Sequence, residues 1–377
     1  MNKARILHLI EDMEIGGLER TVETIYRGLN KKKYTVHLWC LAGGGVLAEM
    51  FIKEGENVRI LNLKSYHNPL NIIRLVLLIR IKRFEIVHTH GYFPGTFGRI
   101  AAFFARVPII ISHVHTTNWD LKKQHRIIER LLSIITDRIL CCSDYVKNFL
   151  NGHEKIHSKK IIRIYNGVKE MKSNINKNEY TSRQKQKTKI VTIASLVKNK
   201  GHRYLIKAIQ NLVEDYPNIE LILVGDGPLS IELKRYAELL KIREKVNFLG
   251  RLSDVEPILQ ESDIVVLPSI EREGLGVALI EAMRHSRPVI GSKIGGIPEL
   301  IDDGVNGYLV PPRDSDALAR KIERLISSNQ ERKRLGDQGR KKYEKKFRAE
   351  KMINDIEKVY DLLLSKKASL AECHRNL

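Results

Sequence analysis

Residues 263–290, DIVVLPSIEREGLGVALIEAMRHSRPVI, decide the fold class of this 377-residue chain. They open with a short apolar run, Ile264 to Pro268, which is typical of a buried strand. A glycine-containing turn follows, then a helical pattern over residues 275–285, then a second apolar run at 288–290. A strand, a helix and a strand in this order predict a unit whose two strands run parallel.

The same alternation continues in both directions along the chain. In the first half we expect strands at residues 5–10, 35–41, 58–63, 86–90, 108–112 and 138–142. In the second half we expect strands at 189–195, 219–225, 246–249, 264–268, 288–290 and 307–310, with helices near 201–215, 228–241, 254–262 and 275–285. This rhythm predicts an α/β protein with two Rossmann-like, doubly wound parallel sheets in tandem. Ligands of such sheets bind beyond the carboxyl ends of the strands, so we expect the two domains to face a central cleft.

The domain boundary is placed by composition. Residues 171–188, MKSNINKNEYTSRQKQKT, are polar, basic and without apolar periodicity, as expected of a linker. We therefore predict a first domain over residues 1–170 and a second over residues 189–345. Residues 346–377 are predicted to form a helical tail that packs back toward the first domain.

The charge indicates an anionic partner without naming it. The chain carries 65 Lys+Arg against 44 Asp+Glu, a net charge of +21, and both halves are basic. Nucleic acid, an anionic membrane and phosphorylated substrates all fit such a balance. The four cysteines, two of them adjacent, form no disulfide framework and no metal-binding spacing. With no secretory leader and no membrane-spanning run, we expect a cytoplasmic protein with at most peripheral membrane contact.

Residues 68–84, NPLNIIRLVLLIRIKRF, allow two interpretations. The segment is mostly aliphatic and contains Arg74, Arg80, Lys82 and Arg83, so it could lie at a lipid interface. On a helical wheel, however, the four cations scatter instead of collecting on one side. A crossover helix packed on the sheet, with its basic side chains reaching solvent, explains the pattern equally well.

The turn after the strand at 264–268 carries the most specific chemistry. Glu273 and Glu281 lie eight positions apart and flank a turn that begins a helix. Backbone N–H groups at such a helix start bind phosphate, and carboxylates accept hydrogen bonds from hydroxyls, the polar groups of sugars. Motifs typical of P-loop ATPases, zinc hydrolases, serine hydrolases and dinucleotide-binding proteins are missing from the sequence.

Taken together, the motifs resemble those of the family-4 glycosyltransferases, retaining enzymes of the GT-B fold that transfer a sugar from a nucleotide donor. The resemblance covers nearly the whole chain. It rests on GGLER, HTHGYFPGTFGR, ISHVHTT, TDRILCCSDYVK, IYNGV, SLVKNKGHRYLIKAI, LVGDGPL, VNFLG and the block from EGLGVALIE to GGIPELI. The last block is the most specific, and the pieces near the N-terminus are weak individually.

The resemblance implies roles for particular residues. Glu273 and Glu281 match the two glutamates of the family's EX7E motif, the first against the donor sugar and the second on the ribose hydroxyls. Lys200 matches the cation that neutralises the donor diphosphate, and His115 matches a hydrogen-bond partner of the donor sugar. Further donor-binding positions are expected at Gly16, Gly17, Gly274, Leu275, Gly276, Val277, Ser195 and Leu252. Ser195 departs from the family, which usually has an Arg there, and Lys198 or Arg203 is a possible replacement.

Four histidines, His88, His90, His113 and His115, lie at the ends of two consecutive predicted strands and could suggest a metal site. No carboxylate or cysteine that would complete such a site lies nearby in the sequence, and the family resemblance implies no metal. We therefore expect no bound metal or cofactor, with a UDP- or GDP-linked sugar as co-substrate. Apart from His115, structural roles are the simpler interpretation of these histidines.

The sequence thus predicts a retaining, metal-independent glycosyltransferase of polysaccharide or glycoconjugate biosynthesis. The resemblance implies a glycan or lipid-linked acceptor. The basic charge fits peripheral binding to the anionic inner face of the cell membrane. Two alternatives remain open at this stage. One is a GT-B epimerase or phosphorylase, and the other is a nucleic-acid-binding protein, which lacks the expected aromatic platform because aromatic residues are only 6% of the chain.

Overall fold

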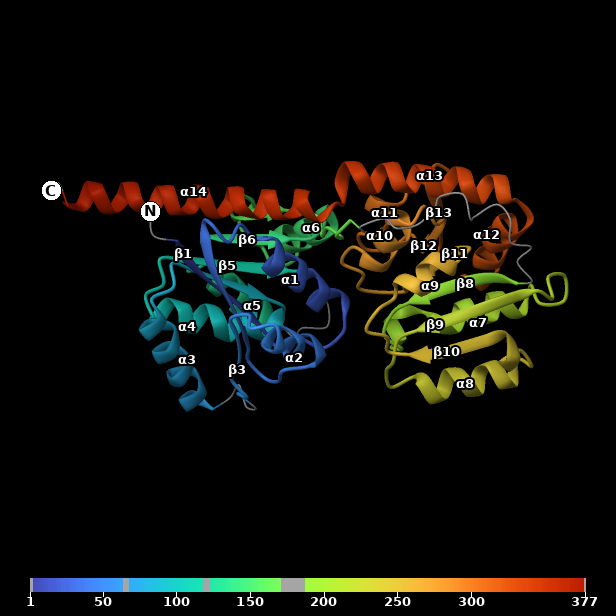
Figure 1. The fold of residues 1–377 in the computed structure, drawn as a ribbon, viewed down its shortest axis with the longest axis horizontal. Coiled ribbons are helices and arrows are strands. Elements are labelled where there is room, and N and C mark those ends of the chain that lie inside the picture. Colours follow the sequence, from blue (N-terminus) through green and yellow to red (C-terminus); the bar gives the residue numbers. More distant parts are fainter. Residues whose placement is uncertain (1–2, 64–67, 118–122, 171–186, 376–377) are drawn as a thin grey trace. The chain divides into compact units, whose positions relative to one another are not determined.

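The computed structural model describes residues 3–63, 68–117, 123–170 and 187–375. The predicted linker at 171–188 therefore falls almost wholly outside the described residues. The chain divides into two compact units. Unit 1 consists of Met1–Gly167 together with Ala349–Leu377, and unit 2 consists of Val168–Arg348 (Figure 1).

Unit 1 is built on a seven-stranded parallel sheet in the order β3-β2-β1-β4-β5-β6-β7. The order reverses between β1 and β4, which is the point where ligands of such sheets bind. The strands are β1 (Ala4–Ile10), β2 (Tyr34–Cys40), β3 (Val58–Ile60), β4 (Ile86–His90), β5 (Ile109–Val114), β6 (Arg138–Cys141) and β7 (Ile161–Arg163). The last strand, β7, was not predicted from the sequence, because three residues are too few to show a periodicity.

Helices cover both faces of this sheet (Figure 1). They are α1 (Gly17–Gly28), α2 (Val46–Lys53), α3 (Pro69–Lys82), α4 (Arg99–Phe104), α5 (Lys123–Leu132), α6 (Asp144–Gly152) and α14 (Ala349–Arg375). Because side chains of a strand alternate between faces, Ile6 and Ile10 pack with α1, α2 and α14, whereas Leu7 and Leu9 pack with α3 and α4. Two apolar cores, one on each face, hold the sheet.

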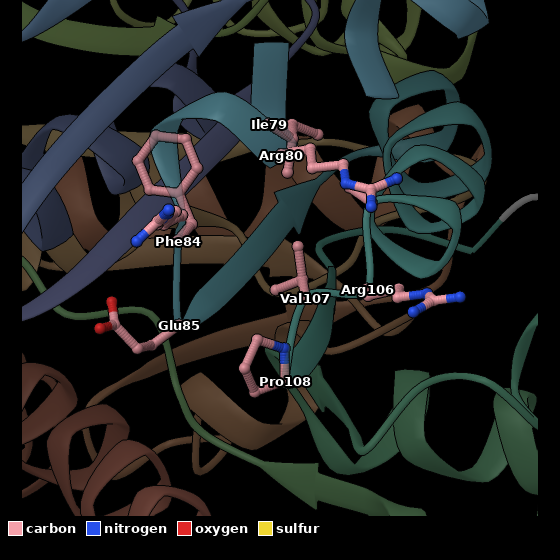
Figure 2. A pocket seen from close by; sticks show the side chains of 9 residues that line it. Ile79, Arg80, Phe84, Glu85, Arg106, Val107 and Pro108 are labelled. Carbon is pink, nitrogen blue, oxygen red and sulfur yellow. The ribbon is translucent and has the colours of Figure 1, made fainter. Parts of the chain in front are cut away.

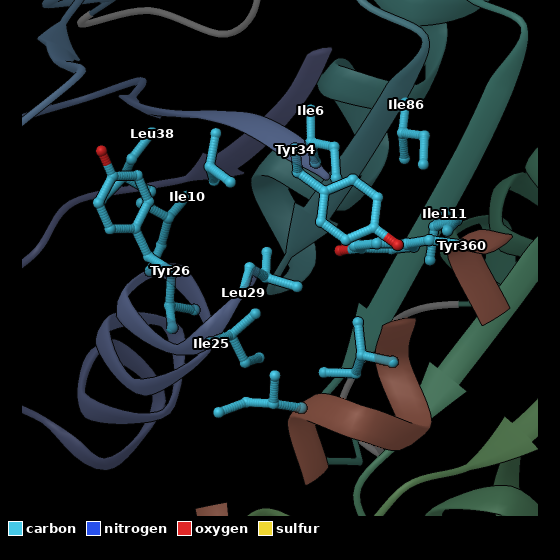
Figure 3. Close-up of a cluster of buried hydrophobic side chains, with 14 of the residues drawn as sticks. Ile6, Ile10, Ile25, Tyr26, Leu29, Tyr34, Leu38, Ile86, Ile111 and Tyr360 are labelled. Carbon is cyan, nitrogen blue, oxygen red and sulfur yellow. The ribbon is translucent and has the colours of Figure 1, made fainter. Parts of the chain in front are cut away.

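The helix α14 belongs to unit 1 although it ends the chain. Its buried side chains, among them Met352, Ile356 and Tyr360, join the core that contains Ile6 and Ile86 (Figure 3). Each fully buried side chain of this size contributes about 1.5 to 3 kcal/mol. A methyl group on Gly28 of α1 would lie 2.0 Å from the end of the Ile353 side chain, so α1 and α14 pack closely there.

Unit 2 contains a six-stranded parallel sheet in the order β10-β9-β8-β11-β12-β13. Its strands are β8 (Thr188–Ile193), β9 (Ile219–Val224), β10 (Val246–Gly250), β11 (Ile264–Leu267), β12 (Val289–Ser292) and β13 (Gly307–Val310). Its helices are α7 (His202–Gln210), α8 (Ser230–Leu239), α9 (Glu256–Glu261), α10 (Val277–Arg284), α11 (Ile297–Leu300), α12 (Ser315–Ser327) and α13 (Asn329–Lys346). All six predicted strands are present, and the sheet reverses between β8 and β11. Two doubly wound parallel sheets confirm the predicted fold class.

None of the described helices is both long enough and apolar enough to span a lipid bilayer.

Candidate active site

Glu273 lies in the loop between β11 and α10, at the carboxyl edge of the second sheet. Its side chain is buried, and its Oε2 accepts two hydrogen bonds, one from Lys200 Nζ at 2.7 Å and one from Ser269 Oγ at 2.8 Å. Its backbone carbonyl accepts a further bond from the N–H of Gly296 at 3.0 Å. Such convergent bonds hold a buried carboxylate in one orientation.

Lys200 reaches Glu273 because of a glycine. The residue ends a short 3-10 turn, η4 (Lys198–Lys200), and is followed by Gly201 with φ of 68°. A methyl group on Gly201 would lie 2.0 Å from the carbonyl oxygen of Pro268, so only glycine allows the loop after β8 to lie against the end of β11. The Ile270 N–H donates to the Asn199 carbonyl at 2.8 Å and joins the same two loops.

A second close approach joins the loop after β9 to the loop after β8. Gly225 has φ of 139°, and a methyl group there would lie 2.0 Å from the carbonyl oxygen of Ala194. The Gly225 N–H donates to Gly250 at the end of β10. Ser195 is exposed within this group of loops, and Leu252, two residues beyond β10, is half-buried. The loops after β8, β9 and β10 are therefore joined by backbone contacts at one edge of the sheet.

The helix α10 begins next to Glu273. Its cap, Gly276, has a left-handed backbone with φ of 98°, and Glu281 lies half-buried in the helix. Gly274, Leu275, Gly276 and Val277 supply the backbone between Glu273 and the first turn. Amide N–H groups at a helix start, beside a lysine, favour a phosphate.

Arg203, one of the two residues expected to replace the arginine missing at Ser195, contacts α8 in this structure. The guanidinium of Arg203 lies 3.7 Å from Glu232 and 4.0 Å from the ring of Tyr236, both in α8. Lys198 is exposed in η4. The ammonium that contacts the Glu273 carboxylate is that of Lys200.

In unit 1, Gly16 caps the start of α1, and Gly17 is the first residue of that helix. A methyl group on Gly17 would meet nothing within 4 Å, and one on Gly16 would meet the flexible end of Glu19. Packing therefore does not require a glycine at Gly17, unlike at Gly201 and Gly225.

Imidazoles gather on one face of the first sheet, near the reversal point. The ring nitrogens of His8 and His90 lie 2.8 Å apart, and those of His90 and His115 lie 3.4 Å apart. His88 Nδ1 lies 2.6 Å from the hydroxyl of Tyr360 in α14, and the rings of His113 and His115 stack with centroids 4.1 Å apart. We call His8, His88, His90, His113 and His115 the histidine cluster.

Burial keeps the histidine cluster uncharged. It lowers the pKa of His8 and of His115 to about 3, while the interaction of His115 with the Asn166 side chain acts in the opposite direction on its pKa. Burial and neighbouring imidazoles lower the pKa of His88, His90 and His113 well below the ordinary value. At neutral pH these rings are therefore hydrogen-bonding groups and not charges.

Neutral imidazoles are also metal ligands, and within the described residues two sets of three bring their nitrogens within 4.8 Å of one another. They are His8 with His88 and His90, and His90 with His113 and His115. The expectation of no metal rested partly on the lack of a completing ligand nearby in the sequence. The register of β1 with β4, which pairs His8 with His88, supplies a third imidazole.

Sequence reasoning missed three residues of these two sites. The register of β1 with β4 brings His8 beside His88, and the packing of α14 on unit 1 brings Tyr360 to His88. Ser269, just after β11, contacts Glu273. The even spacing of His8 with Ile6 and Ile10 places the three on one face of a strand and could have suggested the first. Tyr360 lies far from the other residues in the sequence, and no local pattern indicates its contact.

Comparison with known proteins decides the family. Residues 15–170 match the model described as Glycosyltransferase Family 4, and residues 174–342 match the model described as Glycosyl transferases group 1. An uncharacterized glycosyltransferase of Methanocaldococcus jannaschii is 30% identical over 293 residues, which are 76% of this chain and 78% of that protein. The chain belongs to the family-4 glycosyltransferases.

Other relatives of this glycosyltransferase match over nearly its full length. The Escherichia coli UDP-Gal:alpha-D-GlcNAc-diphosphoundecaprenol alpha-1,3-galactosyltransferase is 25% identical, over 97% of this chain and 99% of that enzyme. Among solved structures, Anabaena HepE in complex with UDP and glucose superposes with a TM-score of 0.82 at 21% identity, covering 94% of this chain and 99% of that one. The similarity to HepE shows that the two proteins share a fold. Its membership of the family shows that the present chain is an enzyme that transfers sugar.

Proposed function

We propose that this glycosyltransferase moves a sugar from a nucleoside-diphosphate donor to a glycan or lipid-linked acceptor, with retention of configuration and without a bound metal. We assign the donor to unit 2 and the acceptor to unit 1. The observation that carries the proposal is the pair of Lys200 and Glu273, joined at 2.7 Å beside the first turn of α10.

In this mechanism the donor diphosphate lies against Lys200 and the backbone N–H groups of residues 274–277. Negative charge develops on the leaving diphosphate as the bond from the sugar carbon to the phosphate oxygen breaks. A fixed ammonium and fixed N–H dipoles stabilise that charge, which is the most effective form of electrostatic catalysis. The acceptor hydroxyl attacks from the same face and passes its proton to the departing phosphate oxygen.

Glu273 takes a positioning role and forms no covalent intermediate in this proposal. Its Oε2 already accepts from Lys200 and Ser269, which reduces its availability as a nucleophile. We assign it to orienting Lys200 and to contacting the donor sugar, and Glu281 to the ribose hydroxyls. His115, neutral at physiological pH, donates or accepts a hydrogen bond at the transferred sugar.

Relatives and charge support a lipid-linked acceptor at a membrane surface. The E. coli relative acts, by its name, on a diphosphoundecaprenol-linked sugar, and the present chain carries a net charge of +21. We propose a lipid-linked acceptor and peripheral binding to an anionic membrane surface, where each nearby cation adds about 1 kcal/mol. Flotation with anionic vesicles at low and high salt tests the binding, and no binding at low salt would refute it.

One set of assays tests the reaction. Nucleotide sugars are first screened by the shift in melting temperature, because a bound donor stabilises the folded state by mass action. The selected donor is then incubated with acceptor lipids and excess chelator, and the anomeric configuration of the product is read by NMR. An inverted product would refute retention, and loss of activity on chelation that added metal restores would refute metal independence.

A further inference from the structure

The outer face of α3 is apolar. Leu70, Ile73, Leu77 and Ile81 recur three or four residues apart and are between 53% and 73% exposed. The opposite side of α3 packs on the sheet through Leu75 and Ile79. The helix therefore presents an aliphatic stripe to solvent, and the segment from residue 68 to 84 contains no acidic residue.

The neighbouring helix α4 extends this apolar surface. It packs beside α3 (Figure 1) and exposes Phe103 and Phe104, 50% and 63% accessible. Contiguous exposed apolar surface on a folded protein is characteristic of an interaction site. We call Leu70, Ile73, Leu77, Ile81, Phe103 and Phe104 the α3–α4 face.

A basic pocket of about 400 Å³ lies at the ends of these two helices. Its lining includes Arg80, Arg83 and Arg106, which we call the arginine pocket. In Figure 2, Arg80 and Arg106 extend toward the same side, away from Phe84. One carboxylate, that of Glu85, also lines the pocket, and it accepts a hydrogen bond from the Arg5 N–H at 2.7 Å.

Arg80, Arg83 and Arg106 are exposed, unlike two buried arginines of the chain that pair with acids. Arg99 pairs with Glu129, and Arg284 pairs with Glu256. Within the ranges that the structure describes, no acidic side chain forms an ion pair with Arg80, Arg83 or Arg106. Three cationic residues in the lining of one hollow attract an anion, and a phosphate offers the oxygen acceptors that guanidinium groups bind best.

We propose that the arginine pocket binds the phosphate of an anionic phospholipid headgroup while the α3–α4 face enters the bilayer interface. The inference deepens the proposed function, on whose peripheral membrane binding it rests, by naming the surface and the lipid group. Arg74 and Arg80 lie on either side of the aliphatic stripe at helical spacing, as in helices that lie in the interface plane.

Other binding partners would match either the arginine pocket or the α3–α4 face, but not both. Nucleic acid would satisfy the arginines but leave the aliphatic and phenylalanine side chains in water. A second copy in a two-fold dimer would cover the apolar residues but bring the same arginines toward one another. An anionic bilayer provides phosphate for the pocket and hydrocarbon for the face.

The test measures partitioning of the full chain onto vesicles of phosphatidylglycerol in phosphatidylcholine by sedimentation. The pocket variant R80Q/R83Q/R106Q removes three charges and should partition about 100-fold less, since each cation near an anionic leaflet contributes roughly a factor of five. The matched control R235Q/K241Q/R320Q removes three exposed charges from unit 2 and should change partitioning by less than about threefold, because screening limits distant charges.

A second variant separates the apolar contribution. L77S/I81S replaces two exposed side chains, so it keeps the fold, and it should weaken binding at high salt as well as at low salt. Inorganic phosphate at constant ionic strength should displace the protein from vesicles only in part, because it competes for the pocket but not for the α3–α4 face. Complete displacement by it, or a single-stranded oligonucleotide that binds the wild type but not the pocket variant, would overturn the lipid assignment.

The outcomes for the inference and for the proposed function are separable. Transfer to a water-soluble acceptor analogue should be equal in the wild type, the pocket variant and the control. If the pocket and control variants bind vesicles alike, the inference is wrong, whereas soluble transfer leaves the proposed function intact. If the wild type binds vesicles through the pocket but transfers no sugar, the proposed function is wrong, and the assignment of the arginine pocket to lipid binding is retained.

Discussion

The carboxyl edges of the two sheets differ in charge although their topology is alike. The second sheet presents one lysine, one glutamate and glycine-rich loops beside β8 and β11. The first sheet presents five imidazoles that burial keeps neutral. The reversal of strand order thus provides a candidate site in each unit, and the side chains decide its chemistry. A charged edge suits a diphosphate, and a neutral polar edge suits hydroxyls.

Breaking the charged pair should have the largest effect. K200A removes the ammonium beside Glu273, and we expect transfer to fall by at least about 100-fold with the fold intact, because a lost transition-state contact of this kind costs about 3 kcal/mol. E273Q should also reduce transfer strongly, because it keeps the shape but removes the charge. Initial rates with the screened donor measure both.

The matched control for this pair is K241A, an exposed lysine of unit 2. It should transfer sugar at the wild-type rate. Wild-type rates in K200A and E273Q would refute the assignment of the site, and loss of the circular-dichroism melting transition would assign the effect to folding instead.

Alanine at Gly201 of unit 2 and at Gly17 of unit 1 should have opposite effects on stability. G201A places a methyl group 2.0 Å from Pro268 O at φ of 68°, and it should destabilise unit 2 by more than about 2 kcal/mol. G17A meets no atom and lies in the first turn of α1, so it should leave stability unchanged or raise it by up to about 1 kcal/mol. Urea denaturation measures both values.

G17A has a second use. If backbone at Gly17 contacts a substrate, the variant should transfer sugar more slowly although it is fully stable. Equal rates would remove Gly17 from the site.

Acid should destabilise unit 1 through the histidine cluster. The folded pKa of these rings lies below the unfolded value of 6.5, so the unfolded chain binds more protons as pH falls below 6.5. The stabilisation is complete above pH 6.5 and is lost as pH falls toward 3, at about 1.4 kcal/mol per pH unit for each ring. Thermal melts followed at Trp39 of unit 1, between pH 7 and 4.5, measure it.

Replacing two of these rings provides the control. H8Q/H88Q should flatten the dependence on pH, whatever its effect on stability at pH 7. The same slope in this variant and in the wild type would show that other groups cause the acid sensitivity.

S195R should have the smallest effect. Ser195 is exposed among the loops at the charged edge, where the family usually has an arginine, so a guanidinium fits there without repacking. We expect the donor to bind up to about fivefold more tightly, because an exposed ion pair contributes up to about 1 kcal/mol. Titration calorimetry with the donor measures the affinity, and weaker binding would show that Ser195 lies outside the diphosphate site.

The sequence by itself determined the fold class and the loop that carries Glu273, because strand and helix periodicities and glycine turns are local properties. Only the tertiary structure decided which distant groups meet. Lys200 reaches Glu273 across two loops, and His8 and Tyr360 join the histidine cluster through strand register and the return of α14.

The segment at residues 68–84 shows the same division. Its cations scatter around a helical wheel, which left its role open in the sequence. Once Leu75 and Ile79 are known to face the sheet, the remaining surface is an aliphatic stripe between Arg74 and Arg80. A helical wheel shows the angles between side chains, but only packing determines which side is left for solvent or lipid.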